Sequence, residues 1–256
     1  MRYEIRELGV GGILDQAIEL TKNHFPLFLG IMLLMYVPVN LLLQGLELLE
    51  VESKTDVAAK SNLTSIIRVV SLLVVAPLTN GAIIQAVSSA YLQQPITAGS
   101  ALGRASRMYL PILGTMFLNG FFVLLGFLML IVPGIIFSLW WLLAIQVVML
   151  EGLTATAALT RSHQLMKGSM LTAMLLGSLM FIIQVMVGVG TEYIPLAPLR
   201  VVADVAVEAF LFVFTAAGWV VLYFSCRSKH ERFDLAILAD AVGSDLPDAA
   251  GVGAGG

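Results

Sequence analysis

Five long stretches of this chain contain no Asp, Glu, Lys or Arg. They have 24, 35, 43, 24 and 18 residues and cover 23–46, 69–103, 108–150, 168–191 and 209–226. A membrane-spanning helix needs about 20 mostly apolar residues, because the hydrocarbon core of a bilayer is ~30 Å thick. A helix also satisfies its backbone hydrogen bonds internally, as a segment surrounded by lipid must. The distribution of charge therefore predicts an all-α, polytopic helical membrane protein.

The longest charge-free stretch has room for two spans, and Val132-Pro133-Gly134 near its middle predicts the turn between them. We therefore expect about six transmembrane helices in a single membrane domain, residues 1–242. The expected spans are 25–46, 66–90, 109–131, 134–150, 170–190 and 205–225. The tail, 243–256, is rich in Gly, Ala and Asp and cannot bury a core, so we expect it to be disordered.

Composition excludes several function classes. Only 12% of the residues are charged, against about 25% in an average soluble domain, and the net charge is −3 with no basic stripe for nucleic acid. The single cysteine, Cys226, excludes an intramolecular disulfide and a cysteine-based zinc site. No phosphate loop, dinucleotide fingerprint, zinc-protease motif or nucleophile elbow occurs. We expect no enzyme activity, no cofactor and no metal, and we expect the three histidines, His24, His163 and His230, to be solvated interfacial residues.

The positive-inside rule orients the chain. Ten Lys and Arg residues lie on the side that holds both termini, and four lie on the other side when Arg68 is included. Both termini are therefore predicted to be cytoplasmic, in a multi-pass protein of the bacterial cytoplasmic membrane. A cleaved signal peptide is not expected, because Glu4, Glu7, Asp15 and Glu19 precede the first apolar run.

Two inner loops resemble each other at an offset of 57 residues. Ile96–Arg104 and Leu153–Arg161 share five of nine residues, and each contains a Thr suited to cap a helix; the alternative is chance similarity between two Ala-rich loops. The N-terminal segment has the same layout, with an apolar stripe from Val10 to Phe25. We therefore expect three hairpin repeats, each preceded by a short amphipathic helix in the membrane interface, at about 9–24, 97–108 and 154–167.

Several short motifs resemble the glycerophosphoryl diester phosphodiesterase membrane-domain family over about residues 8–240. The motifs are Gly12–Ala17, Pro133-Gly134-Ile135, Trp141, Val147–Gly152, Ala158-Leu159, Arg161-Ser162, Leu165, Lys167-Gly168, Leu222-Tyr223-Phe224, Arg227, Glu231 and Phe233-Asp234-Leu235. The chain departs from the family pattern at Ser225, where the family tends to have Asp, and at Gln146, where it tends to have Pro.

The resemblance implies a membrane domain without catalysis. In some family members this domain precedes a phosphodiesterase barrel, which needs ~250 residues. Only about 20 residues follow the last motif, and no His-Arg pair of the kind that such a barrel uses is present. We therefore do not expect phosphodiesterase activity.

Charged residues at the span ends predict two structural ion pairs. Glu151, at the inner end of the fourth span, is expected to pair with Arg161 or with Arg104; the alternative is a solvated carboxylate. At the outer face, Arg68 is expected to pair with Glu208 or Asp204, because an acidic residue one turn into the apolar region needs a partner or a wet cavity. The alternatives there are that all three side chains snorkel into the headgroups, or that they form a site for an anion or a headgroup.

Three functions remain compatible with the sequence. The first is a non-catalytic protein that organises membrane lipid or a protein partner. A second copy of the chain counts as such a partner. The second is a transporter or channel for a small solute, in which uncharged polar residues within the spans line a path instead of joining helices; these are Asn40, Gln44, Asn80, Gln85, Asn119, Gln146 and Gln184. The third is an accessory membrane subunit of an envelope phosphodiesterase, by family analogy.

Overall fold

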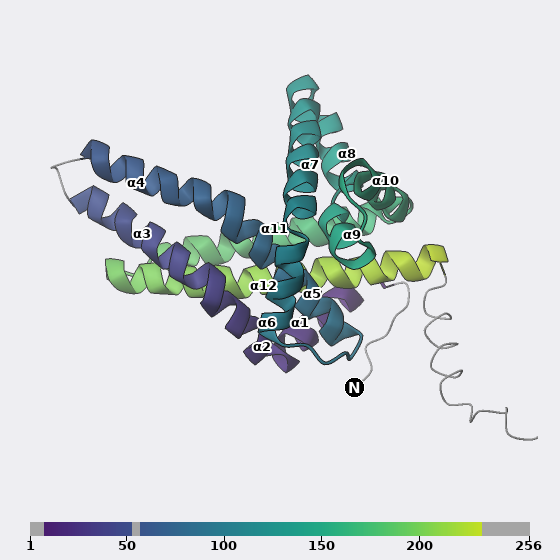
Figure 1. Ribbon diagram of the computed structural model, residues 1–256, viewed down its shortest axis with the longest axis horizontal. Helices are drawn as coiled ribbons and strands as arrows, with labels where there is room; N and C mark the ends of the chain where they lie inside the picture. Colours follow the sequence, from purple (N-terminus) through teal and green to yellow (C-terminus); the bar gives the residue numbers. More distant parts are fainter. Residues whose placement is uncertain (1–7, 53–56, 232–256) are drawn as a thin grey trace, which may run out of the picture.

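A computed structural model describes residues 8–52 and 57–231, and these are helical without any strand among them (Figure 1). The predicted all-α class is confirmed. The elements are α1 (Val10–Asn23), α2 (Phe25–Ile31), η1 (Met32–Tyr36), α3 (Val37–Glu52), α4 (Val57–Val70), η2 (Ser71–Val75), α5 (Ala76–Tyr91), α6 (Ala98–Arg107), α7 (Tyr109–Met129), α8 (Ile131–Trp140), α9 (Ala144–Glu151), α10 (Ala155–Met166), α11 (Met170–Glu192) and α12 (Ala197–Glu231).

Six helical segments within the described residues are long and apolar enough to cross a membrane, as the charge-free stretches predicted. They are Phe25–Leu46, Asn62–Tyr91, Tyr109–Met129, Ile131–Glu151, Met170–Glu192 and Ala197–His230. The chain is therefore built as a multi-pass membrane protein. The predicted tail, 243–256, lies outside the described residues.

The first two spans share a local irregularity. Each contains one π-helical turn, η1 or η2, and in each the turn ends two residues before a proline, Pro38 or Pro77. A proline has no N–H to donate and its ring crowds the carbonyl four residues earlier, so a widened turn at this place relieves both problems. The two prolines are thus accommodated without ending either span.

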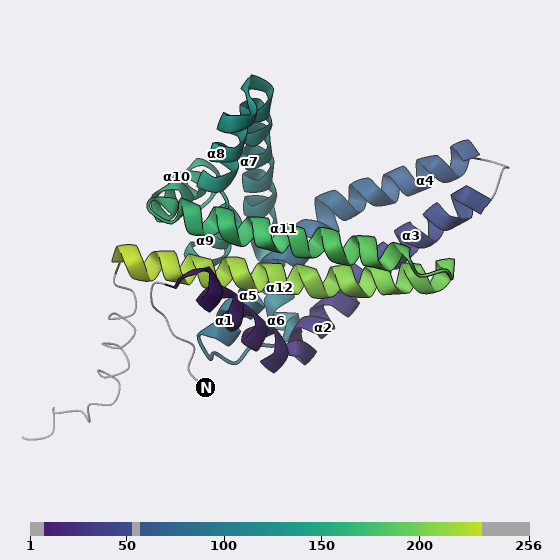
Figure 2. The same ribbon diagram turned by 180° about the vertical axis from the view of Figure 1, so that it is seen from behind.

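Three hairpins extend in different directions from a common base (Figures 1 and 2). The first pairs α3 with α4, the second α7 with α8, and the third α11 with α12. We define the base as α1, α5, α9 and α10, which pack against α12, together with the C-terminal half of α12 and with α6, which packs against α5. Its core includes side chains that are almost fully buried; examples are Ile83, Val147, Met149, Val220 and Tyr223. The helix α12 is the most buried of the six long segments and runs through the centre of the base.

The short helices α1, α6 and α10 occupy the segments for which interfacial helices were expected, one before each hairpin. The two repeated Thr residues stand at matching places, since Thr97 precedes α6 and Thr154 precedes α10. Thr97 forms a capping box with Ser100, whereas the Thr154 side chain makes no capping hydrogen bond. Their location in the membrane interface stays a prediction.

The turn of the second hairpin differs from the expected one. The chain breaks at Leu130, which is extended (φ −166°, ψ 157°), and α8 begins at Ile131, so Pro133 lies within the first turn of a helix instead of in the loop. Proline is well tolerated there because the first N–H groups of a helix have no partner inside it. Glycines let the two helices approach closely, because a Cβ on Gly126 would lie 3.0 Å from Gly134 Cα.

Two spans differ from their predicted outlines. The fourth is broken by a turn at Trp141–Leu143, which separates α8 from α9. The sixth begins at Ala197, eight residues before the expected start at 205, and continues through the base to Glu231. Charged residues near 200–208 suggested an end of the membrane segment, but i to i+4 backbone bonds continue regardless of side-chain charge.

Candidate functional site

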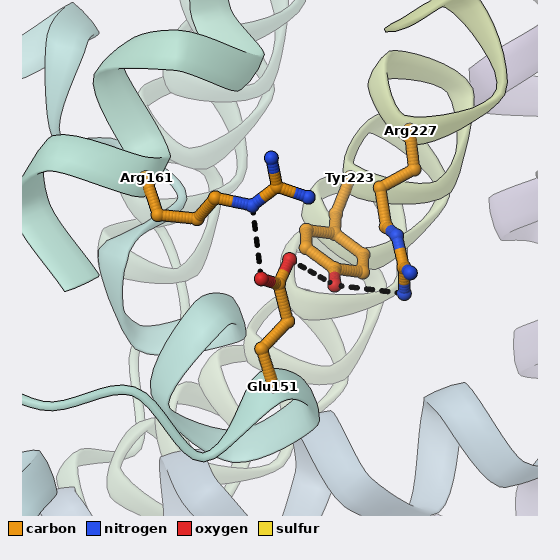
Figure 3. A network of polar contacts seen from close by, with 4 residues as sticks. All are labelled: Glu151, Arg161, Tyr223 and Arg227. Atoms are coloured by element: carbon orange, nitrogen blue, oxygen red, sulfur yellow. Dashed lines mark hydrogen bonds and ion pairs between the residues drawn. The ribbon is translucent and has the colours of Figure 1, made fainter. Parts of the chain in front are cut away.

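A polar network at the C-terminal end of the fourth span joins three helices (Figure 3). Arg161 on α10 donates from Nε to Oε2 of Glu151, the last residue of α9, over 2.9 Å. The Tyr223 hydroxyl of α12 donates to Oε1 of the same carboxylate over 2.8 Å. Arg227, one turn further along α12, donates from Nη1 to the Tyr223 oxygen over 3.3 Å. Both carboxylate oxygens of Glu151 are thus engaged.

Of the two partners expected for Glu151, the structure brings Arg161 and not Arg104 to the carboxylate. Gly152 makes this geometry possible, because its left-handed conformation (φ +72°) ends α9 and turns the chain toward α10. Tyr223 was missed by the sequence analysis. Its spacing of four residues from Arg227 places both on one face of α12, but no sequence signal connects that face to Glu151.

The broken fourth span is held by the third short helix. At the break, Leu143 N–H donates to Ser162 Oγ over 3.2 Å, and Ser162 Oγ donates to the Trp140 carbonyl over 2.9 Å. Ser162 is fully buried, so its hydroxyl replaces backbone hydrogen bonds that the turn removes. The neighbouring His163 lies edge-on to Trp140, with the ring centroids 4.5 Å apart, and its buried Nδ1 has no hydrogen-bond partner among the described residues.

A small polar cavity of about 170 Å³ lies in the base between α5, α6 and α12. Two arginines from different helices line it, Arg104 of α6 and Arg227 of α12, together with the buried Ser88 and Ser89 of α5. Gln85 completes one wall, with its Nε2 donating to Ser89 Oγ over 3.3 Å. Among the described residues, the lining contains two guanidinium groups and no carboxylate.

The predicted outer-face ion pair is not formed. Among the described residues, neither Asp204 nor Glu208 makes an ion pair with Arg68; the Tyr36 hydroxyl instead donates to Glu208 Oε2 over 3.3 Å. The physical reason is packing, because α3, and not α4, is the helix of the first hairpin that lies along α12. The Tyr36 ring also contacts the Phe212 ring in a tilted arrangement, with the ring centroids 5.7 Å apart.

A second polar cavity, of about 480 Å³, lies beside this contact. It is lined from the first and third hairpins, and its polar residues are Tyr36, Gln184, Thr191, Glu192, Asp204 and Glu208. Gln184 also joins two helices, since its Nε2 donates to Thr215 Oγ1 over 3.3 Å. By contrast, Asn40 and Gln85 bond within their own helices, so the polar residues of the spans serve only in part to join helices.

The histidines lie apart from one another. His24 packs edge-on to Phe28, and His230 Nε2 lies 2.9 Å from the Lys167 carbonyl. In residues 8–52 and 57–231, no group of three or more His, Cys, Asp or Glu is placed to hold a metal ion.

Comparison with known proteins places the chain in a family. The model of a domain of unknown function, DUF8558, matches residues 106–251, which is more than half of the chain and includes α7 to α12. No curated protein and no solved structure matches the chain. The matched range contains Glu151, Arg161, Tyr223 and Arg227, whereas Arg104 and the first hairpin lie before it. On this match, the chain belongs to the DUF8558 family, whose members share a domain of unknown function.

Proposed function

We propose that this protein is a non-catalytic integral membrane protein that organises anionic lipid at the cytoplasmic leaflet of the bacterial cytoplasmic membrane. The observation that carries the proposal is the position of basic residues in and around the base. Arg104 and Arg107 lie in the last turn of α6, and Lys229 lies in the last turn of α12. Basic residues at span ends attract anionic headgroups, each by about 1 kcal/mol near the surface.

The same asymmetry supports a topology with both termini in the cytoplasm. Lys and Arg are retained on the cytoplasmic side of membrane proteins, and the base contains both the N-terminal helix α1 and the C-terminal half of α12. An outward-facing base is the opposite arrangement. A reporter that is active only outside the cytoplasm, fused to the C-terminus, distinguishes the inward-facing from the outward-facing base. Activity of this reporter would overturn the topology with both termini in the cytoplasm.

The absence of catalysis is part of the proposal. The polar side chains of the network are occupied with one another, since Glu151 accepts from both Arg161 and Tyr223. This supports a structural role for the carboxylate.

The resemblance to the glycerophosphoryl diester phosphodiesterase membrane domain supports a role as an accessory subunit of an envelope phosphodiesterase, with a protein partner or a second copy of the chain as the bound macromolecule.

One observation favours a second candidate function, transport of a small solute. The outer polar cavity of about 480 Å³ lies between two hairpins, and carboxylates in its wall can attract a cation. A transporter of this kind needs the cavity to open to both sides of the membrane in turn.

Native mass spectrometry of the detergent-purified protein, followed by titration with phosphatidylglycerol or phosphatidylcholine, tests the proposal. We expect anionic glycerolipid to remain bound and phosphatidylcholine to dissociate first. Preparations that retain no lipid and show no preference between the two would overturn the lipid-organising function. Solute flux across vesicles that contain the protein, above that of empty vesicles, would establish transport instead.

A further inference from the structure

A groove of about 260 Å³ lies between the first and the sixth of the long helical segments. The helix α12 packs against α1 and α3, and α2 and η1, which lie between those two in the chain, form the facing wall of the groove. We call the lining side chains that are at most 7% exposed the floor; they are Thr21, Phe28, Met32, Val205, Ala209 and Val213. Other lining side chains, such as Leu33, Val202 and Phe210, are about half exposed and form a rim. The groove is therefore closed at its floor and open along one side.

The lining of the groove is apolar. Among the described residues that line it, Thr21 alone has a polar side chain, and its hydroxyl donates to the Ala17 carbonyl over 2.7 Å. A cavity without polar partners does not hold ordered water. An empty groove would also leave the floor without van der Waals contacts on one side. The lining therefore selects a hydrocarbon ligand.

The π-helical turn η1 keeps a polar side chain out of this groove. Met32 lines the groove, and α-helical spacing would bring Tyr36, four residues further on, to the same side. A π-helical turn contains one residue more than an α-helical turn, so the next residue, Val37, lines the groove instead. Tyr36 lines the polar cavity together with Glu208. The irregular turn thus separates an apolar face from a polar face on one span.

The dimensions of the groove match a single hydrocarbon chain. From Val202 to Val213 the groove follows α12 for roughly 17 Å, at ~1.5 Å per residue. This length is close to the ~15 Å of one leaflet, which is half of a hydrocarbon core of ~30 Å. A cavity of ~150 Å³ holds one benzene molecule, so 260 Å³ holds roughly ten chain carbons. A partner helix is about 10–12 Å wide, and over the same length it needs several times the volume of the groove.

The rim adjoins the surface that the long helices present to lipid. All lining residues except Thr21 belong to Phe25–Leu46 or Ala197–His230, two of the segments that are long and apolar enough to cross a membrane. Near the rim, Leu34 and Leu199 are exposed as well, and lipid tails are as apolar as such leucines. Acyl chains are therefore the molecules that surround the opening of the groove.

We propose that this groove binds one acyl chain of a membrane glycerolipid. The chain lies along α12 between the rims and covers the floor. The site goes beyond the lipid-organising function, because the groove recognises hydrocarbon, whereas the basic residues of the base attract headgroups.

Photolabelling in nanodiscs tests the site. The discs contain equal amounts of phosphatidylglycerol and phosphatidylcholine, with a trace of either lipid carrying a diazirine in one acyl chain, and peptide mass spectrometry locates the adducts. We expect adducts on Met32 and Val205, which are each 1% exposed, because only a chain inside the groove reaches the floor. The helix α7 is the internal control, since Phe117 and Leu128 are largely exposed and contact surrounding lipid in every sample.

Two substitutions on α12 provide the matched comparison. Ala209→Phe fills the groove from its floor, and it should lower floor labelling at least about fivefold relative to α7, which corresponds to about 1 kcal/mol. Leu199→Phe adds an aromatic ring to the exposed surface outside the groove and should change floor labelling less than about twofold. If Ala209→Phe fails to fold, Ala206→Phe narrows the groove from the rim, and the wild-type labelling pattern is itself a test.

The outcomes separate the groove from the lipid-organising function. An unlabelled floor beside a labelled α7 overturns the groove, as does floor labelling that Ala209→Phe and Ala206→Phe leave unchanged. An unlabelled floor that cross-links to a second copy of the chain also overturns it. Floor labelling by both diazirine lipids supports recognition of the chain alone, and labelling by phosphatidylglycerol alone supports recognition of chain and headgroup together. Selective retention of anionic lipid in native mass spectrometry by a protein with an unlabelled floor leaves the lipid-organising function standing without the groove.

Discussion

Replacing Glu151 with Gln removes a charge from the centre of the polar network with almost no change in side-chain size. The Glu151 and Arg161 side chains are 16% and 22% exposed, so most of each is removed from solvent. Exposed ion pairs contribute about 0–1 kcal/mol, whereas hydrogen bonds to charged groups contribute about 1.5–3 kcal/mol. We therefore expect Glu151→Gln to lower the unfolding free energy by about 1.5–3 kcal/mol, because Arg161 and Tyr223 both lose a charged partner.

The assay is a double-mutant cycle on detergent-solubilised protein unfolded with increasing denaturing detergent. It compares the wild type, Glu151→Gln, Arg161→Gln and the double variant, which isolates the coupling between the two side chains. A pair in direct contact typically gives a coupling energy of about 0.5–3 kcal/mol, and we expect a value above 1 kcal/mol here. Tyr223→Phe provides a third measurement, since it removes only the hydroxyl that donates to Oε1.

Two results would refute this reasoning. The first is additivity, in which the double variant loses the sum of the single losses to within about 0.5 kcal/mol. The second is an unchanged stability of Glu151→Gln together with an unchanged stability of Tyr223→Phe. Either result shows that the carboxylate is effectively solvated and does not tie α9 to α10 and α12. Arg107→Gln, an exposed change on another helix of the base, serves as a control that should stay within ±0.5 kcal/mol of the wild type.

Three further substitutions test the packing of the base and the contact between Tyr36 and Glu208 by the same unfolding assay. Ser162→Ala should lower the unfolding free energy by about 1–3 kcal/mol, because two backbone groups at the break of the fourth span lose a buried hydrogen-bond partner. A loss below about 0.5 kcal/mol would mean that the hydroxyl does not stabilise the turn between α8 and α9. Gly81→Ala should lower the unfolding free energy by up to about 2 kcal/mol, since the new Cβ would approach three neighbouring side chains within 2.8–3.2 Å. Gly120→Ala places its Cβ in open space and should be neutral or stabilising. Equal effects at the two glycines would contradict this packing. Tyr36→Phe should lower the unfolding free energy by about 0.5–1.5 kcal/mol, because it removes the hydrogen bond to Glu208. In a Glu208→Leu background the same substitution should have no effect on the unfolding free energy. A loss that persists in that background would assign the effect to other contacts of the ring.

The sequence by itself determined the class of the protein and the places where its helices lie. A charge within hydrocarbon is costly, so the five charge-free stretches locate the apolar parts of the six long helices, whereas α12 extends beyond its stretch at both ends. The repeated loops likewise predicted the starts of α6 and α10, and at α6 the Thr97 hydroxyl accepts a hydrogen bond from the backbone immediately after it. Such signals are local, and local signals can be read from the chain.

Only the tertiary structure decided which side chains meet. The sequence left Glu151 with two possible arginines, and the turn at Gly152 together with the packing of α10 selected Arg161. It placed Arg68 and Glu208 at the same face of the membrane, but α3 packs along α12 and brings Tyr36 to the carboxylate instead. The small cavity shared by Arg104 and Arg227 likewise depends on how α5, α6 and α12 pack, and these residues are 123 positions apart in the chain. Residues on different helices meet according to which helices are neighbours and how each is rotated, and the hydrophobic pattern of a membrane helix, apolar on nearly every face, does not encode that rotation.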